Sequence, residues 1–414
     1  MTTTHFSEQC DVLVAGAGVA GIAAALESAR AGFKTILVEK TILPGGLATS
    51  GLIYIYLPLC DGNGHQVVFG IAEELLQLSI RFGPGDIPAG WRSVVNGIEE
   101  RRYRTPFSPA AFVLALDEVL EQAGVILMYD TLVCQAVVEA GRITGLEVEN
   151  KSGRGLLRAS CVIDATGDAD VAYRAGATCA DGDNWLSLCA IQNSHRSNPD
   201  ANADKPTPFP LNVLALGSNP YGDGQPAGMP KYSGTDHQQV TRFVLEGRRL
   251  LRQYYQAHQA GETGRQDLFP VCLPSQAQFR TTRRIVGRTT LTEGQQGIFF
   301  ADSIGLAPDW RKAGPIWEIP LNTLIPVGVE GLVAAGRCIS SAGDAWEVTR
   351  VIPVAALTGQ AAGIVARLAV QHHILPHQVS AGMVQQELSR QGIPYHISDL
   401  TSNPALINTS CNPG

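Results

Sequence analysis

Glycines near the N-terminus have the spacing of a dinucleotide-binding turn. Gly16, Gly18 and Gly21 form a GxGxxG pattern that follows a predicted strand and opens a predicted helix. Gly16 permits the tight turn, Gly18 lets the backbone approach a pyrophosphate, and Gly21 allows helix and strand to pack closely. Glu39 ends the second predicted strand about 20 residues on, where its carboxylate can accept hydrogen bonds from ribose hydroxyls. That carboxylate would repel an NADP 2′-phosphate, so the pattern predicts a site for NAD or FAD.

The elements that must position these residues form a βαβ unit. Residues 10–15 predict a buried strand, residues 19–31 a helix of small side chains, and residues 35–39 a second short strand. A Ser at the N-cap, a Pro at the first helical position and a closing Gly predict a helix over residues 108–124. Further strands are predicted at residues 125–128, 131–139, 143–149, 162–165, 281–287 and 331–336, and further helices at residues 239–260, 354–371 and 379–391.

The predicted strands gather toward both ends of the chain, and the middle is irregular. Residues 190–239 are rich in Pro, Asn, Gly, Asp and Ser, and this predicts a lid or a docking surface over residues 195–238. We expect a discontinuous nucleotide-binding domain with an inserted α+β substrate or cap domain. The expected boundaries are residues 6–55, 105–175 and 325–375 for the first domain, 56–104 and 176–324 for the second, and 376–414 for a C-terminal helix and tail.

The composition favours an ordered protein without nucleic-acid or membrane partners. With 31 Lys and Arg against 38 Asp and Glu, the net charge is −7 and no basic block is present to attract nucleic acid or an anionic membrane. The nine cysteines include no CxxC pair, so we expect neither a metal site nor an iron–sulfur cluster. The N-terminus lacks a basic segment typical of a signal peptide, and the longest apolar run, residues 12–26, is too short to span a bilayer. We therefore expect a cytoplasmic location.

Glycines later in the chain favour FAD over NAD. Gly45 and Gly46 directly follow the second predicted strand, and two more segments with regularly placed glycines occupy residues 331–336 and 354–363. A site that draws on both ends of the chain differs from an NAD-binding domain, which would be complete within the first half. The sequence therefore predicts an FAD site.

Taken in this order, the motifs carry a family resemblance. The chain resembles the FAD-dependent oxidoreductases of the fumarate reductase and succinate dehydrogenase-like superfamily. It is more closely similar to the bacterial FAD-dependent oxidoreductases that share a flavin domain with the flavoprotein component of heterodisulfide reductase. The resemblance implies an enzyme of the α/β class, with a Rossmann-like FAD-binding domain of glutathione reductase type. The matching segments are GAGVAGIAAA, GGLATSGL, GIAEELL, VIDATGDADVA, RRIVGRTTLT, IPLNTLIPVGVEGLVAAGRCIS and RVIPVAALTGQAAG.

The resemblance implies which segments contact the adenosine half of FAD. The GxGxxG glycines would hold the pyrophosphate, and Glu39 would bind the adenosine ribose. The backbone of Val133 would read the adenine, and residues 166–168 would close over the adenosine side.

The resemblance also implies the contacts of the flavin half. Residues 45–46 would pass the ribityl chain, residues 49–51 would run along the isoalloxazine ring, and residues 336–337 would make a second flavin contact. Residues 359–361 would place a helix N-terminus near the pyrimidine end of the ring, where reduced flavin accumulates negative charge. The complete set of expected cofactor-binding residues is Gly16, Gly18, Ala20, Gly21, Glu39, Lys40, Gly45, Gly46, Thr49, Ser50, Gly51, Val133, Thr166, Gly167, Asp168, Gly336, Arg337, Gly359, Gln360 and Ala361.

The sequence departs from the family pattern at two places. Gly343 and Asp344 stand where typical members carry a His-Glu pair, so no catalytic histidine is expected there. Leu47 and Ala48 follow the glycine pair where succinate dehydrogenases attach flavin to a histidine, so we expect noncovalent FAD.

Arginines and histidines supply the catalytic candidates. Related enzymes place an arginine at a point comparable to Arg350 to hold or protonate a carboxylate, which a guanidinium binds through two parallel hydrogen bonds. The alternative for Arg350 is a structural salt bridge with Glu347. Arg283 and its neighbouring arginine point to opposite faces of a predicted strand, so one of them is expected to face the cavity. His195 and His237 lie in the irregular middle, where either could serve as a general base.

Three functions remain open from the sequence. The favoured one is an oxidoreductase that transfers a hydride between a small organic substrate and FAD, with an unknown electron donor or acceptor and with self-association allowed. A monooxygenase or halogenase is the alternative, since Trp317 belongs to half of the WxWxIP halogenase motif, although Pro315 replaces its first tryptophan. The third is a flavin-carrying electron-transfer subunit of a larger complex.

Overall fold

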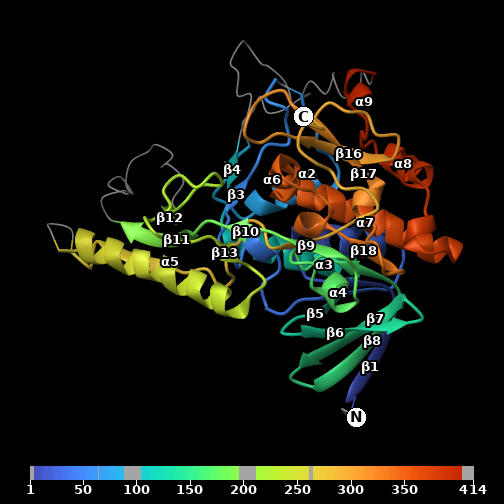
Figure 1. The fold of residues 1–414 in the computed structure, drawn as a ribbon, viewed down its shortest axis with the longest axis horizontal. Coiled ribbons are helices and arrows are strands. Elements are labelled where there is room, and N and C mark those ends of the chain that lie inside the picture. Colours follow the sequence, from blue (N-terminus) through green and yellow to red (C-terminus); the bar gives the residue numbers. More distant parts are fainter. Residues whose placement is uncertain (1–3, 64, 88–103, 195–210, 261–263, 403–414) are drawn as a thin grey trace.

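The computed structural model describes residues 4–63, 65–87, 104–194, 211–260 and 264–402 (Figure 1). Residues 195–210 of the predicted lid at residues 195–238, His195 among them, therefore lie outside the described residues.

The centre of the molecule is a seven-stranded sheet whose parallel strands come from both ends of the chain. Its order is β5-β2-β1-β8-β7-β6, and β18 also pairs with β8. The pairs β1–β2, β2–β5, β1–β8 and β8–β18 are parallel, whereas β6–β7 and β7–β8 are antiparallel. The strands are β1 Phe6–Ala15, β2 Thr35–Val38, β5 Ile126–Met128, β6 Leu132–Glu139, β7 Arg142–Asn150, β8 Gly153–Asp164 and β18 Leu332–Ala334. This arrangement confirms the expected α/β class.

Both faces of the sheet are buried, as the two sets of side chains of β1 show. Neighbouring residues of a strand point to opposite faces of the sheet. Val12 and Val14 pack with α1 (Val19–Arg30) and α7 (Ile352–His372) in the largest core cluster. Leu13 and Ala15 belong to a second cluster, which includes residues of β7 and of the short α4 (Asp170–Arg174). The continuous apolar character of residues 12–15 follows from this double burial.

Helix α7 lies against α1 through small side chains. A Cβ built on Gly359 would stand 2.1 Å from the Ala20 carbonyl oxygen, so only glycine allows this approach. Among the described residues, α7 alone is long and apolar enough to span a membrane, and 94% of its most apolar window is buried inside the protein. Its apolarity is therefore that of a core helix (Figure 1).

A second sheet with one long helix projects from the side of the molecule (Figure 1). Its strand order is β12-β11-β14, formed by Asn212–Gly217, Ser187–Ser194 and Leu268–Cys272. Helix α5 (His237–His258) packs on this sheet through a small core that includes Leu188 and Leu251. The prediction that residues 190–239 are irregular was wrong for these strands. β11 pairs with β14, which comes much later in the chain. Because the sequence between these two strands is rich in Pro and Gly, a strand pattern is not evident there.

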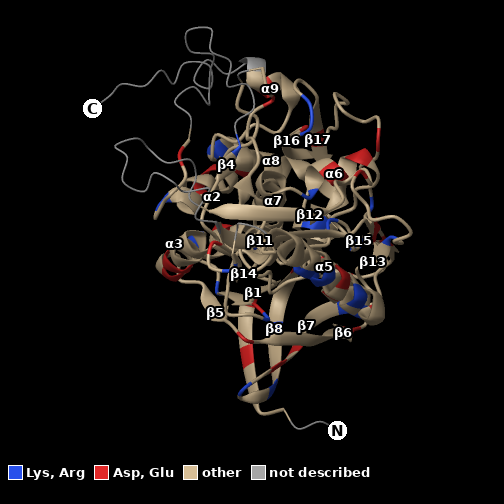
Figure 2. Ribbon diagram, turned by 90° about the vertical axis from the view of Figure 1, so that its left-hand side faces the viewer, with Lys and Arg blue, Asp and Glu red and all other residues tan. Residues whose placement is uncertain are grey.

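Most arginines of α5 face solvent, and basic residues are visible along this helix in Figure 2. Arg249 is paired with Glu246 at 2.6 Å. Asp236 is the N-cap of the helix, and its side chain accepts a hydrogen bond from the Gln239 amide. This cap explains why α5 begins two residues before the predicted position.

The remaining elements close the edges of these two sheets. The hairpin of β16 and β17 is covered by α8, the observed form of the helix predicted at residues 379–391. Ser108 caps α3 by accepting from the Ala111 amide at 3.3 Å, as the predicted Ser-Pro start requires. These elements are α2 Ile71–Ile80, α3 Pro109–Gln122, α6 Asp344–Thr349, α8 Ala381–Arg390, α9 Ile397–Ser402, β3 Ile55–Tyr56, β4 Thr105–Pro106, β9 Cys179–Asp181, β10 Asp183–Asn184, β13 Tyr232–Ser233, β15 Arg283–Ile285, β16 Ser303–Pro308 and β17 Ile316–Pro320.

Candidate functional site

A cavity opens where the parallel strands of the large sheet reach their carboxyl ends. This edge of a parallel α/β sheet is where such folds place their ligands. The cavity is bordered by the turn between β1 and α1, the end of β2, the loop after β2, the segment after β8 and the segment after β18. The expected site residues that line it are Gly16, Gly18, Ala20, Glu39, Lys40, Gly45, Gly46, Val133, Thr166, Gly167, Gly336, Arg337 and Arg350.

The β1–α1 turn has the geometry of an anion-binding turn. Gly16 has φ +95°, and a Cβ there would stand 2.7 Å from the Ala165 carbonyl oxygen. A Cβ on Gly21 would stand 1.8 Å from the carbonyl oxygen of Gly16, so helix and turn touch through glycine alone. Gly18 is the N-cap of α1 and provides no side-chain cap, and the first residues of this helix, Val19 and Ala20, line the cavity. The amides of this first turn have no side-chain partner among the described residues, so they are free to bind an anion.

The second glycine segment lies directly beside the first. The Gly45 amide donates to the Ala17 carbonyl oxygen at 2.7 Å, and Gly45 has φ +105°. A Cβ on Gly46 would stand 3.0 Å from the Cα of Gly18. Gly16, Gly18, Gly45 and Gly46 therefore form one continuous backbone surface on the cavity lining, which we term the glycine wall.

Glu39 is held at the edge of this wall by backbone amides. One carboxylate oxygen accepts from the Ala17 amide at 2.9 Å, and the other accepts from the Thr41 amide at 3.0 Å. The second oxygen also accepts from the Thr41 hydroxyl at 2.9 Å, so the oxygen bound to the Ala17 amide is the one that can accept a further hydrogen bond. Glu39 is thus oriented toward the cavity with acceptor capacity to spare.

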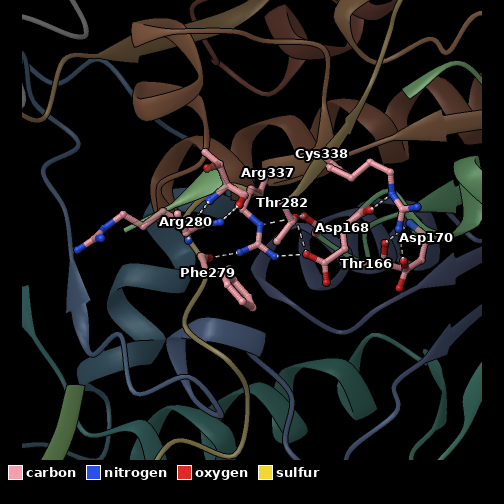
Figure 3. Close-up of polar contacts among 12 residues, drawn as sticks. Thr166, Asp168, Asp170, Phe279, Arg280, Thr282, Arg337 and Cys338 are labelled. Carbon is pink, nitrogen blue, oxygen red and sulfur yellow. Dashed lines mark hydrogen bonds and ion pairs between the residues drawn. The ribbon is translucent and has the colours of Figure 1, made fainter. Parts of the chain in front are cut away.

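Arg337 joins three segments of the chain beside the cavity (Figure 3). Its guanidinium donates to the Gly167 carbonyl oxygen at 2.8 Å, to Asp168 at 2.5 Å and to the Phe279 carbonyl oxygen. Thr282 adds a 2.7 Å hydrogen bond to the same carboxylate oxygen of Asp168. Asp168 is therefore held outside the cavity lining as the partner of Arg337.

Asp164 fastens the loop that precedes Asp168. Its buried carboxylate accepts from the Thr166 amide and hydroxyl and from the Ala172 amide. Burial raises the pKa of Asp164, and these hydrogen bonds oppose that rise. The loop and the start of α4 are thereby fixed to the end of β8.

Residues 275–282, which we term the covering segment, close over residues 49–51. The amides of Ser275 and Gln276 donate to the Ser50 carbonyl oxygen at 2.9 and 3.3 Å. The Gln278 side chain donates to the Gly51 carbonyl oxygen at 2.5 Å, and Gln276 lines the cavity. Residues 49–51 therefore lie under this segment and not on the cavity lining. The sequence analysis missed Gln276 and Gln278, because no local pattern reveals a partner more than 200 residues away.

The expected helix N-terminus at residues 359–361 is wrong, because α7 begins at Ile352 with Pro353 in its first turn. Gly359, Gln360 and Ala361 lie inside the helix. Gly359 packs on α1, and the Gln360 side chain accepts from the Ile71 amide at 3.0 Å. The part of α7 that lines the cavity is its first turn, with Ile352 and Ala355.

Of the catalytic candidates within the described residues, only Arg350 lines the cavity. Arg350 lines it and also donates to Glu347 at 2.5 Å. The salt bridge weighed for this residue is therefore present, and the role of Arg350 in holding a carboxylate stays a prediction. Arg283 pairs with Asp170 at 3.0 Å and stacks over a tyrosine, away from the cavity lining. His237 is exposed at the first position of α5. Neither Arg283 nor its neighbour Arg284 faces the cavity, because β15 directs them to α4 and to α6.

Metal ligands and disulfides are not found in the described part of the chain. No group of three or more His, Cys, Asp or Glu side chains there is placed to hold a metal. Burial raises the pKa of several thiols, for example that of Cys10 to about 12 and that of Cys179 to about 11. These thiols therefore remain protonated at neutral pH.

The parallel sheet, the glycine wall and the oriented carboxylate define a dinucleotide-binding protein of the Rossmann-like class. The chain matches the model of the family described as FAD dependent oxidoreductase over residues 11–388. The protein belongs to this family of FAD-dependent oxidoreductases. It is therefore an enzyme whose cofactor is FAD.

Individual proteins resemble the chain over shorter stretches. Thioredoxin reductase of Ureaplasma parvum serovar 3 is 33% identical over 73 residues, which are 18% of this chain and 24% of that protein. A probable electron transfer flavoprotein-quinone oxidoreductase, YgcN, of Escherichia coli K12 is 46% identical over 44 residues, which are 11% of this chain and 10% of that protein. In both cases the matched stretch is a quarter or less of the length of the curated relative.

Among solved structures, a geranylgeranyl bacteriochlorophyll reductase-like protein of Thermoplasma acidophilum is similar over 98% of this chain and 89% of its own. The two share 17% sequence identity, and the TM-score is 0.49.

The residues around the cavity fit FAD. The helix N-terminus and the glycine wall suit a pyrophosphate, since a Cβ on Gly18 would meet no protein atom within 4 Å. This open space beside the start of α1 is what the pyrophosphate of a bound cofactor would fill.

Proposed function

We propose that the protein transfers a hydride between a small organic substrate and noncovalently bound FAD. When bound, FAD supplies the hydride acceptor or donor of the reaction. The observation that carries the proposal is the shared lining of one cavity by the glycine wall and by Arg350. We also propose that the protein is related to fumarate reductase and to the flavoprotein component of heterodisulfide reductase.

The residues of the chain have separate tasks in this proposal. Gly16, Gly18 and the first amides of α1 bind the pyrophosphate, and Glu39 binds the adenosine ribose. The covering segment excludes water from residues 49–51. Arg350 orients the substrate, because Glu347 fixes its guanidinium through two hydrogen bonds to one oxygen atom.

We further propose that the enzyme works in the cytoplasm with a separate electron donor or acceptor, without nucleic-acid or membrane partners. Self-association is compatible with this proposal. A monooxygenase or halogenase activity has less support. Trp317 is 2% exposed in the core and does not line the cavity.

The first test is the visible absorption spectrum of the purified protein before and after acid precipitation. We expect a two-banded flavin spectrum whose colour passes into the supernatant. Gly18→Val should lose the colour while its far-UV circular dichroism stays native, because a side chain there enters the open space of the pyrophosphate site. A colourless protein that also fails to take up added FAD contradicts the proposal.

Anaerobic and aerobic assays separate the reaction classes. Reduction of the flavin by a free small molecule without O₂ supports hydride transfer. Substrate oxidation that requires stoichiometric O₂ supports a monooxygenase instead. Reduction that depends wholly on another protein supports an electron-transfer role within a larger complex.

A further inference from the structure

The outward face of α5 carries a row of arginines, which appears as a run of basic residues on this helix in Figure 2. Arg242, Arg249 and Arg252 are exposed and follow one another at steps of seven and three residues, so they share one face of the helix. Arg248, also exposed, lies at the border of this face. The four arginines, which we term the arginine row, extend over about 15 Å of the helix axis, because each residue adds 1.5 Å.

Most of the arginine row is unpaired. The one acidic residue within α5 is Glu246, and it pairs with Arg249 at 2.6 Å. Arg242, Arg248 and Arg252 form no ion pair with any residue that the structure describes. Like charges four residues apart on a helix, as in Arg248 and Arg252, repel each other, so a partner that supplies carboxylates would stabilise the row. The whole chain has a net charge of −7, so the row is opposite in sign to the molecule that carries it.

An exposed leucine lies within the arginine row. Leu245 is 55% exposed and comes three residues after Arg242 and four before Arg249, so it lies between them on the same face. Protein interfaces combine an apolar centre with a polar rim, and they are enriched in Arg and depleted in Lys. α5 contains no lysine. A helix that binds a membrane instead needs a continuous exposed apolar face, whereas the apolar face of α5 is already buried on its sheet.

The arginine row lies beside the segment that closes over the FAD site. Val244 and Arg248 of α5 line a small cavity together with Ser275 and Gln276 of the covering segment. Gln276 also lines the FAD cavity. α5 and the FAD cavity are therefore connected through a residue of the covering segment, and a protein bound to α5 would lie next to that segment.

We propose that the arginine row docks an acidic electron-carrier protein that exchanges electrons with the bound FAD. This assignment rests on the proposed function, which includes a separate electron donor or acceptor. Carboxylates of the carrier would pair with the unpaired guanidinium groups, whose planar shape matches two carboxylate oxygens. Leu245 would pack at the centre of the contact. Opposite charges on the two surfaces would also steer the carrier toward this face.

The electron exchange is balanced by two carriers and one proton. Two molecules of a reduced one-electron carrier give up one electron each, solvent supplies one proton, and FAD becomes FADH⁻. The same step in reverse returns two electrons to two oxidised carriers and releases the proton.

The test measures binding of a negatively charged [2Fe–2S] ferredoxin to the FAD-loaded protein by calorimetry, at low and at high salt. A positively charged c-type cytochrome is the control protein. The double variant Arg242→Gln with Arg252→Gln removes two unpaired charges of the row. Its matched control is Arg142→Gln with Arg288→Gln, which removes two exposed arginines that also form no ion pair among the described residues and lie outside α5 and its sheet. Leu245→Ser removes the apolar side chain within the row.

We expect the wild-type protein to bind the ferredoxin more tightly than the cytochrome, and salt to weaken this binding because exposed charges are screened. The double variant in the row should weaken it about tenfold and reduce its dependence on salt. Leu245→Ser should weaken it without changing the dependence on salt, and the matched control should bind as wild type. The rate of flavin reduction by reduced ferredoxin, followed anaerobically in a stopped-flow instrument, should change in the same order.

Equal affinity for the two carrier proteins, or equal binding by the row variant and its matched control, would overturn the inference. It would also be overturned if a short single-stranded oligonucleotide, or vesicles of phosphatidylcholine and phosphatidylserine, bound the row more tightly than the ferredoxin. Self-association that the row variant abolishes would assign the row to a second copy of this chain instead.

The docking proposal and the proposed function can fail separately. Flavin reduction by a small organic substrate is measured without any carrier protein, so its outcome does not depend on the arginine row. Calorimetry with the ferredoxin needs no substrate, and native circular dichroism and unchanged FAD affinity in all variants show that a loss of binding is local to α5.

Discussion

At the scale of single residues, Arg337 shows how one side chain can connect distant parts of the site. The sequence analysis assigned it a flavin contact, and it does line the cavity. Three of its guanidinium hydrogen bonds nevertheless go to the protein, at Gly167, Asp168 and Phe279. Its first task is therefore structural, because it holds the loop after β8 against the covering segment.

Arg337→Met should lower the free energy of unfolding by about 3 kcal/mol, because it leaves Asp168 and two carbonyl oxygens without their partner. The measurement is urea unfolding followed by circular dichroism. Arg158→Met is the matched control, since Arg158 forms an exposed pair with Glu139 at 2.9 Å and should cost less than about 1 kcal/mol. Equal losses in the two variants would refute the structural role of Arg337.

At the scale of elements, the contact of α1 with α7 decides where the cavity can form. The first turn of α7 reaches the cavity only because the middle of the helix lies flush against α1 at Gly359. Gly363 repeats this contact one turn on, where a Cβ would stand 2.7 Å from the Ala24 carbonyl oxygen. The small residues that the sequence analysis assigned to the flavin thus serve helix packing.

Gly359→Ala should destabilise the protein by about 2 kcal/mol or more, because the added Cβ must push α7 away from Ala20. Gly382→Ala is the same substitution in α8, where a Cβ meets nothing within 4 Å, and it should stabilise by about 0.5–1 kcal/mol through helix propensity. Thermal unfolding of both variants measures the difference. If both substitutions shift the melting temperature upward, the proposed helix contact is wrong.

At the scale of the whole molecule, the site is assembled from segments that are far apart in the chain. The glycine wall comes from the first 50 residues, the covering segment from residues 275–282 and the first turn of α7 from residue 352 onward. The backbone bonds from Ser275 and Gln276 to Ser50 join the first two. Binding of FAD should therefore stabilise all of these segments together.

Hydrogen exchange with and without FAD tests this coupling. We expect slower exchange in peptides covering residues 16–22, 45–51 and 275–282 when FAD is present, because a ligand that binds only the folded state suppresses opening of the segments around it. A peptide covering α8 should exchange at the same rate in both samples. Protection confined to residues 16–22 would show that the covering segment opens independently of the cofactor.

What the sequence by itself determined about this protein is the local backbone chemistry of the nucleotide site. The positions of Gly16, Gly18, Gly21 and Glu39 encode a turn, a helix N-terminus and a carboxylate within one βαβ unit, so short-range geometry is sufficient to predict a dinucleotide site. Tertiary structure alone decided which arginines line the cavity. Arg350 reaches the lining, whereas Arg283 pairs with Asp170, and neither position is visible from the neighbouring residues in the chain. The physical reason is that the charge partners and burial of a side chain depend on segments that only folding brings together.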